Sequence, residues 1–169
     1  VLVPHTAALD VAAGLTVSAW VRPEQRATQY VVKKAYHGDV DGFELGLSGG
    51  GSPFLRFNNA TSGNIYRVDA TSPYPTDGDT WMHLVGTYDG ETMRIYVDGE
   101  EQASAPGPDA VATNALPLGL GAESDGSRAL LGGLDGVRMF DRALDAEGVS
   151  ALHGSSGPAE PPEAAGATF

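Results

Sequence analysis

The sequence predicts an all-β protein, a sandwich or jelly roll, and three observations support this prediction. Apolar and polar residues alternate with a period of two along most of the chain, which is typical of half-buried strands. Short apolar runs are separated by turn residues, and few segments show a helical pattern. The 23 glycines and 11 prolines among the 169 residues also argue against a helical bundle. The length favours one domain.

The clearest strand begins at Leu15, where Leu, Val, Ala and Val alternate with Thr, Ser, Trp and Arg up to Arg22. Successive side chains of a strand point to opposite faces, so the first set is expected to face the core. About eleven strands are expected in all. They are Val1–Val3, Leu15–Arg22, Tyr30–Lys34, Phe43–Ser48, Phe54–Asn58, Tyr66–Ala70, Trp81–Tyr88, Met93–Val97, Gln102–Ala105, Leu116–Leu120 and Leu134–Phe140.

Turn chemistry separates these runs. Asp-Gly occurs six times, and glycine supplies the positive φ that tight turns require. Two helical segments are expected: a single turn at His5–Leu9 and a short helix at Asp145–His153, with Asp145 as N-cap and Gly154 as its stop.

The two ends of the chain differ from the strand-rich part. Residues 154–169 are rich in Gly, Pro, Ala and Ser and hold too little apolar surface to offset the entropy of ordering. We therefore expect a domain over residues 1–153 and a flexible linker or tail over 154–169. Because the sequence opens without Met or a signal peptide, we interpret it as a module of a larger chain.

The net charge of the chain is −12, from 10 basic and 22 acidic side chains. Such a chain is repelled by phosphate backbones and anionic lipid surfaces, so no nucleic-acid partner is expected. No apolar run approaches the length of a membrane-spanning helix, so no membrane insertion is expected. The absence of cysteine excludes disulfides and cysteine-based zinc sites.

Four motifs, in this order, resemble a known family: LTVSAWVRP from Leu15, WMHLVGTYDG from Trp81, MRIYVDG from Met93 and GLDGVRMFDRAL from Gly133. They are similar to the laminin-G-like domains of the concanavalin A-like lectin/glucanase superfamily. The resemblance implies a two-sheet antiparallel jelly roll with a curved concave face and one short C-terminal helical turn. It also implies an extracellular, secreted or cell-surface, non-catalytic module that binds glycans or proteins, often with one structural Ca²⁺.

Calcium binds oxygen ligands, and two places in the chain could supply them. The resemblance implies that Asp135, in the last long strand, can meet carbonyl groups of the N-terminal segment. The alternative is that Asp135 pairs with an arginine or caps a turn. Asp39 and Asp41 have the spacing that opens a calcium-binding loop, although the rest of that pattern is missing, and an ordinary Asp-Gly turn is the favoured interpretation.

A glycan site needs an aromatic plane and a few amide or guanidinium donors. By alternation, Leu55 and Phe57 share one face while Arg56 and Asn58 share the other, so the polar pair is expected on an exposed sheet face. Arg56, Asn58, Tyr66 and Tyr36 are therefore the predicted ligand-binding residues. The alternative is an ordinary polar sheet surface.

Other large or polar side chains of the motifs are expected to be structural. Trp20 and Trp81 lie mid-strand and are expected to pack between the layers, and His83 is expected to be a hydrogen-bonded strand residue. No segment has the alternating carboxylates of a glycosidase strand, so the protein is not expected to be an enzyme. The predicted function is a non-catalytic glycan-recognising module. The alternatives are a protein-adhesion or structural module, and a polysaccharide hydrolase of the same fold.

Overall fold

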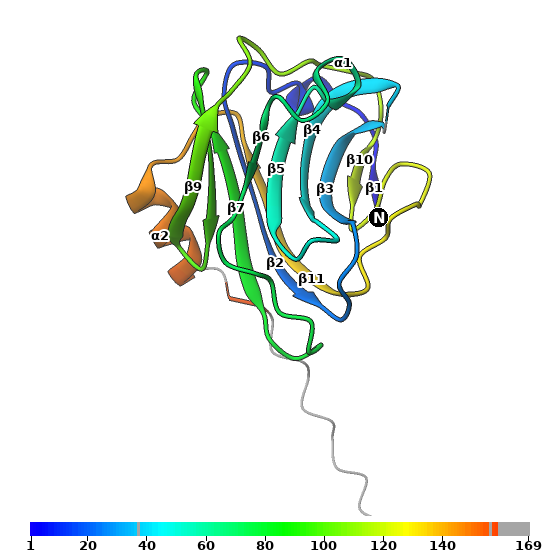
Figure 1. Cartoon of the computed structure of the whole chain (residues 1–169). Coiled ribbons are helices and arrows are strands. Elements are labelled where there is room, and N and C mark those ends of the chain that lie inside the picture. The colour runs from blue at the N-terminus through cyan, green and yellow to red at the C-terminus, as the bar shows by residue number, and fades with distance from the viewer. Residues whose placement is uncertain (37, 156, 159–169) are drawn as a thin grey trace, which may run out of the picture.

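Two antiparallel sheets lie face to face in the computed structural model, which describes residues 1–36, 38–155 and 157–158 (Figure 1). The six-stranded sheet has the order β1 (Leu2–Val3), β10 (Leu118–Leu120), β3 (Gln29–Tyr36), β4 (Val40–Leu47), β5 (Pro53–Phe57) and β6 (Arg67–Asp69). The five-stranded sheet has the order β11 (Gly132–Phe140), β2 (Leu15–Pro23), β7 (Met82–Tyr88), β8 (Thr92–Val97) and β9 (Glu100–Pro106). This arrangement confirms the predicted two-sheet sandwich.

Three short helices complete the described elements: η1 (Ala7–Leu9), α1 (Asn59–Ser62) and α2 (Ala146–Ser155). The first and last were expected, and Asp145 caps α2 by accepting a hydrogen bond from the Gly148 amide at 2.8 Å. The helix ends at Ser155, one residue beyond the predicted stop at Gly154. Most of the predicted tail, residues 159–169, lies outside the described residues. Among those described, no helix has both the length and the apolar character needed to cross a bilayer.

The core lies between the two sheets and is built by the alternation seen in the sequence. Leu15, Val17 and the other inward residues of β2 are fully buried against the inward residues of the opposite sheet. Gly86 marks a close approach of the layers, because a Cβ there would lie 2.8 Å from Leu55 Cδ1. The alternation therefore decided which face of each strand is apolar, and burial of that face holds the sheets together.

The outer face of the five-stranded sheet is covered by the chain that follows β11. Thr16 is fully buried there, and its hydroxyl donates to the Arg142 carbonyl at 2.7 Å and accepts from the Leu144 amide at 2.8 Å. Helix α2 then places Val149 against Val85 and Tyr96 in a second, smaller apolar cluster. In Figure 1 this helix lies outside the sheet that contains β9 and β7.

The prediction that both tryptophans pack between the layers is wrong. Trp20 lies on the outer face of the five-stranded sheet, where its ring centroid is 5.0 Å from that of His83 and 5.2 Å from that of His153 on α2. Trp81 is half-buried, with the Arg22 guanidinium 5.5 Å from its ring centroid. The alternation of β2 itself explains the first result, because Trp20 belongs to the set opposite the core residues.

His83 is a buried strand residue, as expected, but its ring is not hydrogen-bonded. Its backbone amide donates to Asp98 Oδ1 at 2.8 Å, whereas neither ring nitrogen has a hydrogen-bond partner among the described residues. Burial, followed by the charges of the neighbouring His153 and Arg138, lowers the pKa of His83 to about 4. The imidazole is thus held neutral under α2.

Candidate functional site

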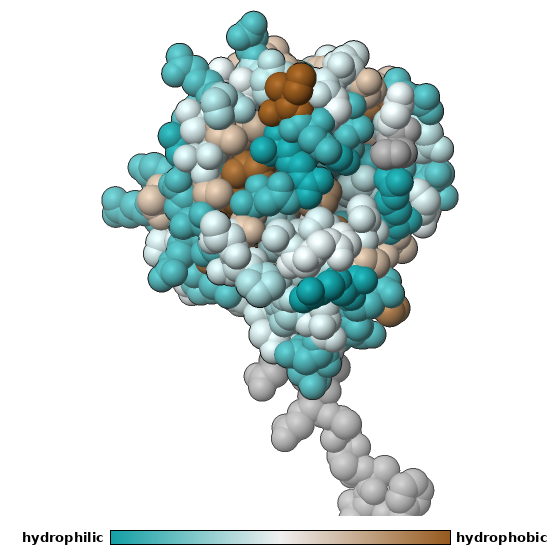
Figure 2. Space-filling view, in the orientation of Figure 1, coloured by the Kyte–Doolittle hydropathy of each residue, from teal (hydrophilic) through white to brown (hydrophobic). Residues whose placement is uncertain are grey.

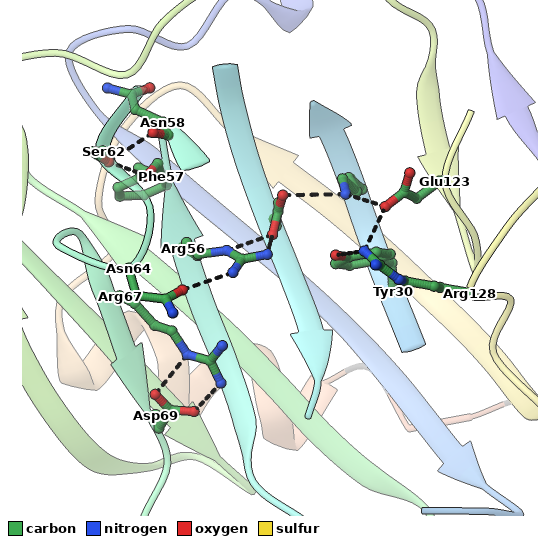
Figure 3. A network of polar contacts seen from close by, with 12 residues as sticks. Tyr30, Arg56, Phe57, Asn58, Ser62, Asn64, Arg67, Asp69, Glu123 and Arg128 are labelled. Atoms are coloured by element: carbon green, nitrogen blue, oxygen red, sulfur yellow. Dashed lines mark hydrogen bonds and ion pairs between the residues drawn. The ribbon is translucent and has the colours of Figure 1, made fainter. Parts of the chain in front are cut away.

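The outer face of the six-stranded sheet carries a row of charged side chains, and hydrophilic surface (teal) covers much of this side of the molecule in Figure 2. Glu123 Oε1 lies 2.5 Å from Lys33 Nζ, which in turn lies 3.2 Å from Glu44 Oε1. Arg56 then donates to Glu44 Oε2 through Nε at 2.8 Å and Nη2 at 2.5 Å, and through Nη1 to Asn64 Oδ1 at 2.8 Å. We call these five residues the polar network (Figure 3).

Strand register explains why the polar network forms. In the pairing of β3, β4 and β5, Lys33 is opposite Glu44 and Glu44 is opposite Arg56. Three neighbouring strands therefore place a positive, a negative and a positive side chain side by side on one face, and opposite charges at facing positions stabilise a sheet. Lys33 and Glu44 are each at most 1% exposed, so these charges depend on one another for solvation.

Two aromatic rings lie on the same face, beneath cationic side chains. Lys33 Nζ lies 3.7 Å from the ring centroid of Tyr30, and the Arg67 guanidinium lies 4.2 Å from that of Phe54. Cations in such positions are attracted by the negative face of the ring. Tyr30 and Phe54 are 0% and 1% exposed, so neither ring offers an open plane to solvent.

A hollow of about 200 Å³ opens on this face, and we call it the arginine hollow. Arg128 forms one side of it from the loop between β10 and β11, and its Nη1 donates to the Tyr30 hydroxyl at 3.0 Å and to Glu123 Oε1 at 3.3 Å. Arg67 stands at the other side, where it forms a two-pronged ion pair with Asp69 (Figure 3). The lining residues are Thr28, Tyr30, Ser48, Phe54, Arg56, Arg67 and Arg128, which include no carboxylate.

A second hollow, of about 420 Å³, lies beside α2 and has a different chemistry. Its only arginine, Arg94, donates to Asp89 Oδ2 at 2.6 Å, and Glu101 and Asp145 also line it. Acidic side chains therefore dominate this larger space, and no aromatic–cation pair of the kind seen in the arginine hollow is found among its described residues. We take the arginine hollow as the candidate site.

The four predicted ligand-binding residues are not brought together. Arg56 lines the arginine hollow, whereas Tyr36 lies at the end of β3 and donates its hydroxyl to Asp125 Oδ2 at 3.1 Å, which raises the pKa of Tyr36. The side-chain amide of Asn58 binds the backbone of residues 110–112. It donates to the Ala110 carbonyl at 3.0 Å and accepts from the Ala112 amide at 2.9 Å. Tyr66 packs against the core.

The predicted calcium ligands are also separated. Asp135 lies in β11 and accepts a hydrogen bond from the Gly136 amide at 2.7 Å. In the other sheet, Asp39 lies in the turn between β3 and β4 and Asp41 lies near the start of β4, where both of its carboxylate oxygens accept hydrogen bonds from Thr61. No group of three or more metal-ligating side chains gathers among the described residues, so these side chains alone do not fit a calcium site.

Sequence reasoning missed most of the hollow. Phe54 could have been found, because it lies two residues before Arg56 and therefore shares its face. Arg128 could not, because it comes from an irregular loop that reaches the sheet only in the folded protein, where its carbonyl accepts a hydrogen bond from the Tyr30 amide at 3.1 Å.

Comparisons with known proteins agree with this architecture. One relative is the Adhesion G-protein coupled receptor V1 of Danio rerio, 22% identical over 153 residues, which are 85% of this chain and 2% of the receptor. The structure is similar to a putative carbohydrate binding protein from Bacteroides ovatus, with a TM-score of 0.68 and 18% identity over 88% of this chain and 43% of that one.

A further similar structure is domain 4 of AbnA, a GH43 extracellular arabinanase from Geobacillus stearothermophilus, in complex with arabinotriose. Its TM-score is 0.63, with 23% identity over 84% of this chain and 67% of that one. These likenesses concern the fold. Residues 1–150 match the family described as the concanavalin A-like lectin/glucanases superfamily, in its laminin G group. The chain therefore belongs to this superfamily, as its four motifs indicated.

Proposed function

We propose that this chain is a non-catalytic module that recognises a saccharide on the outer face of its six-stranded sheet, within a larger extracellular protein. One observation carries the proposal: this face is open at the arginine hollow, whose walls offer guanidinium and hydroxyl donors. Sugars are held by a small number of such fixed polar groups. The similar arabinanase domain, solved in complex with arabinotriose, supports a saccharide ligand for a domain of this fold.

The chemistry of the face favours binding over hydrolysis. A glycosidase needs one carboxyl group to protonate the leaving oxygen and a second to act as nucleophile or base. Glu44 and Glu123, the two buried carboxylates of the polar network, both bind Lys33, and Glu44 also binds Arg56. Both groups are thus engaged by cations and are at most 2% exposed, which leaves neither of them facing a substrate.

A glycan array tests the proposal, with the protein labelled and the array read in buffers with and without calcium. We expect binding to a restricted set of saccharides, and a loss of binding in the variant Arg67→Gln. Binding to no saccharide under either condition would remove the proposal. That result would favour a protein-adhesion module, which the similarity to an adhesion receptor supports.

The calcium ion stays a prediction. An ion that binds only the native protein raises its stability by RT ln(1 + [L]/Kd), so melting with calcium and with a chelator is a direct test. A higher melting temperature in calcium supports an ion held partly by backbone carbonyls. Equal melting temperatures in the two buffers would remove the prediction.

A further inference from the structure

We propose that the arginine hollow selects an anionic saccharide, one that carries a carboxylate or a sulfate group. This inference rests on the proposed function and names the class of ligand. It comes from three properties of the hollow: its local charge, the position of its aromatic rings, and the hydrogen-bond donors that it leaves unused.

The hollow is locally cationic in a protein of net charge −12. Lys33, Arg56, Arg67 and Arg128 lie in or beside it, against the three carboxylates of Glu44, Asp69 and Glu123. Glu123 is shared, because its Oε1 is 2.5 Å from Lys33 Nζ and 3.3 Å from Arg128 Nη1. Asp125, on the same loop, turns to the Tyr36 hydroxyl. One positive charge in this group therefore has no carboxylate of its own.

The buried rings argue against a site built for a neutral sugar. Neutral sugars place their C–H face on an exposed aromatic plane. Here Tyr30 and Phe54 are buried with cations against their rings, whereas the side chains of Arg67 and Arg128 are 21% and 35% exposed. A ligand in the hollow would therefore contact the arginine side chains and not the face of an aromatic ring.

Within the part of the chain that the structure describes, Arg128 leaves unpaired the edge of its guanidinium group, Nε and Nη2, that Arg56 and Arg67 use to bind carboxylates. Arg56 donates hydrogen bonds to Glu44, and Arg67 donates hydrogen bonds to Asp69, each through Nε and Nη2. Arg128 donates only through Nη1, so its Nε and Nη2 have no hydrogen-bond partner among the described residues. This planar edge matches the two oxygens of a carboxylate or a sulfate. The Thr28 hydroxyl on the lining is a further donor for the sugar.

Titration calorimetry with matched pairs of short oligosaccharides tests the proposal. The first pair is trigalacturonate and its methyl ester, which share a backbone and differ in charge. The second pair is a sulfated and an unsulfated dextran oligomer. Short oligomers limit the repulsion from the acidic surface. A charge-assisted hydrogen bond contributes enough for us to expect the acid of one pair to bind roughly tenfold to a hundredfold more tightly than its neutral form.

Variants assign the selectivity to the hollow. Arg128→Gln is expected to weaken binding of the preferred anion by roughly tenfold or more and to leave the neutral form unchanged. Arg94→Gln is the matched control, because Arg94 is 31% exposed and lies in the other hollow, where it pairs with Asp89 and Glu101. If Arg128→Gln fails to fold by its melting curve, Arg67→Gln replaces it, with the same expected loss.

The outcomes separate this inference from the proposed function. If the methyl ester and the unsulfated oligomer bind as tightly as their anionic forms, the selectivity is overturned while the saccharide site stands. Equal losses of acid and ester binding in Arg128→Gln would also overturn it. If no member of either pair binds and the array is also empty, the proposed function fails and this inference fails with it.

Discussion

The outer faces of the two sheets bury polar side chains by opposite means. On the six-stranded sheet, Lys33, Glu44 and Arg56 form ion pairs with one another, and none of the described helices lies over the middle of β3, β4 and β5 (Figure 1). On the five-stranded sheet, His83 is held neutral, with no hydrogen bond to its ring among the described residues, and α2 lies over it. The six-stranded sheet thus stabilises its buried polar groups by ion pairing, and the five-stranded sheet shields its buried histidine with α2.

This difference is consistent with the position of the arginine hollow on the sheet face that α2 does not cover. Paired charges need no apolar cover, so their donors can remain beside solvent in a hollow. An unpaired imidazole beside a tryptophan must be shielded from water and from protonation, so that face is occupied by the protein itself. The two faces should therefore respond differently to substitution and to pH.

The largest effect is expected from breaking the polar network. Glu44→Ala leaves Lys33 and Arg56 without their shared carboxylate, and removing one partner of a buried ion pair costs about 3–5 kcal/mol. Urea unfolding measures the loss. Glu101→Ala is the control, because its side chain is 42% exposed and the change should cost less than about 1 kcal/mol. Equal losses in the two variants would contradict the pairing argument.

The next effect is the pH dependence of the covered face. The pKa of His83 is about 4 in the folded protein and 6.5 for the free side chain, so the unfolded chain binds more protons between these values. The free energy of unfolding therefore falls as the pH is lowered from 6.5 to 4, by on the order of 3 kcal/mol from this residue. His83→Leu should remove that part of the slope in unfolding curves recorded across this range.

Asp77, in an exposed turn, titrates outside the range of pH 4 to 6.5 that is assigned to His83. Hydrogen bonds from Thr80 and Asp79 lower the pKa of Asp77 to about 2, so its contribution is present above its ordinary pKa and is lost only as the pH falls towards 2. A slope that persists in His83→Leu between pH 6.5 and 4 would show that another group is responsible.

A smaller effect is expected from loosening the cover. Asp145→Ala removes the side-chain cap of α2 and should cost about 1 kcal/mol. Amide hydrogen exchange should rise within Ala146–Ser155 and remain unchanged in β4. Asp79→Ala, at an exposed turn, is the control. Faster exchange in β4 as well as in Ala146–Ser155 would mean that α2 and the polar network are not independent of each other.

The smallest effect on stability is expected at the hollow itself. Arg128 is 35% exposed, and exposed ion pairs contribute at most about 1 kcal/mol. Arg128→Gln should therefore melt close to the parent protein while losing anion selectivity. A loss as large as that of Glu44→Ala would place Arg128 in the structural network and not at a binding edge.

The fold was predictable because its signals are local. Period-two alternation in β2 set the buried face, and the Asp-Gly turns separated the strands, so the eleven strands and two of the three helices were expected from sequence. The short helix α1 was missed, because Asn59–Ser62 has only four residues and no apolar periodicity.

The candidate site was predictable only where alternation decided it. Arg56 was placed correctly on the face opposite Leu55, but the same reasoning could not show that Glu44 and Lys33 would lie beside it, because strand register is set by tertiary pairing. Asn58 departs from the alternation altogether, since its left-handed backbone, with φ of 51°, turns the chain into α1.

The position of Arg128 has a consequence for how such a module can change its ligand. Its φ of 47° places it in a turn, and the loop is anchored to β3 at Tyr30 and Gln29, whose Oε1 accepts from the Leu131 amide at 2.7 Å. The hollow thus has one wall made of strands and one wall made of a replaceable loop. Because loops tolerate insertion and substitution far better than sheets, new specificities could be grafted onto this scaffold by exchanging a single segment.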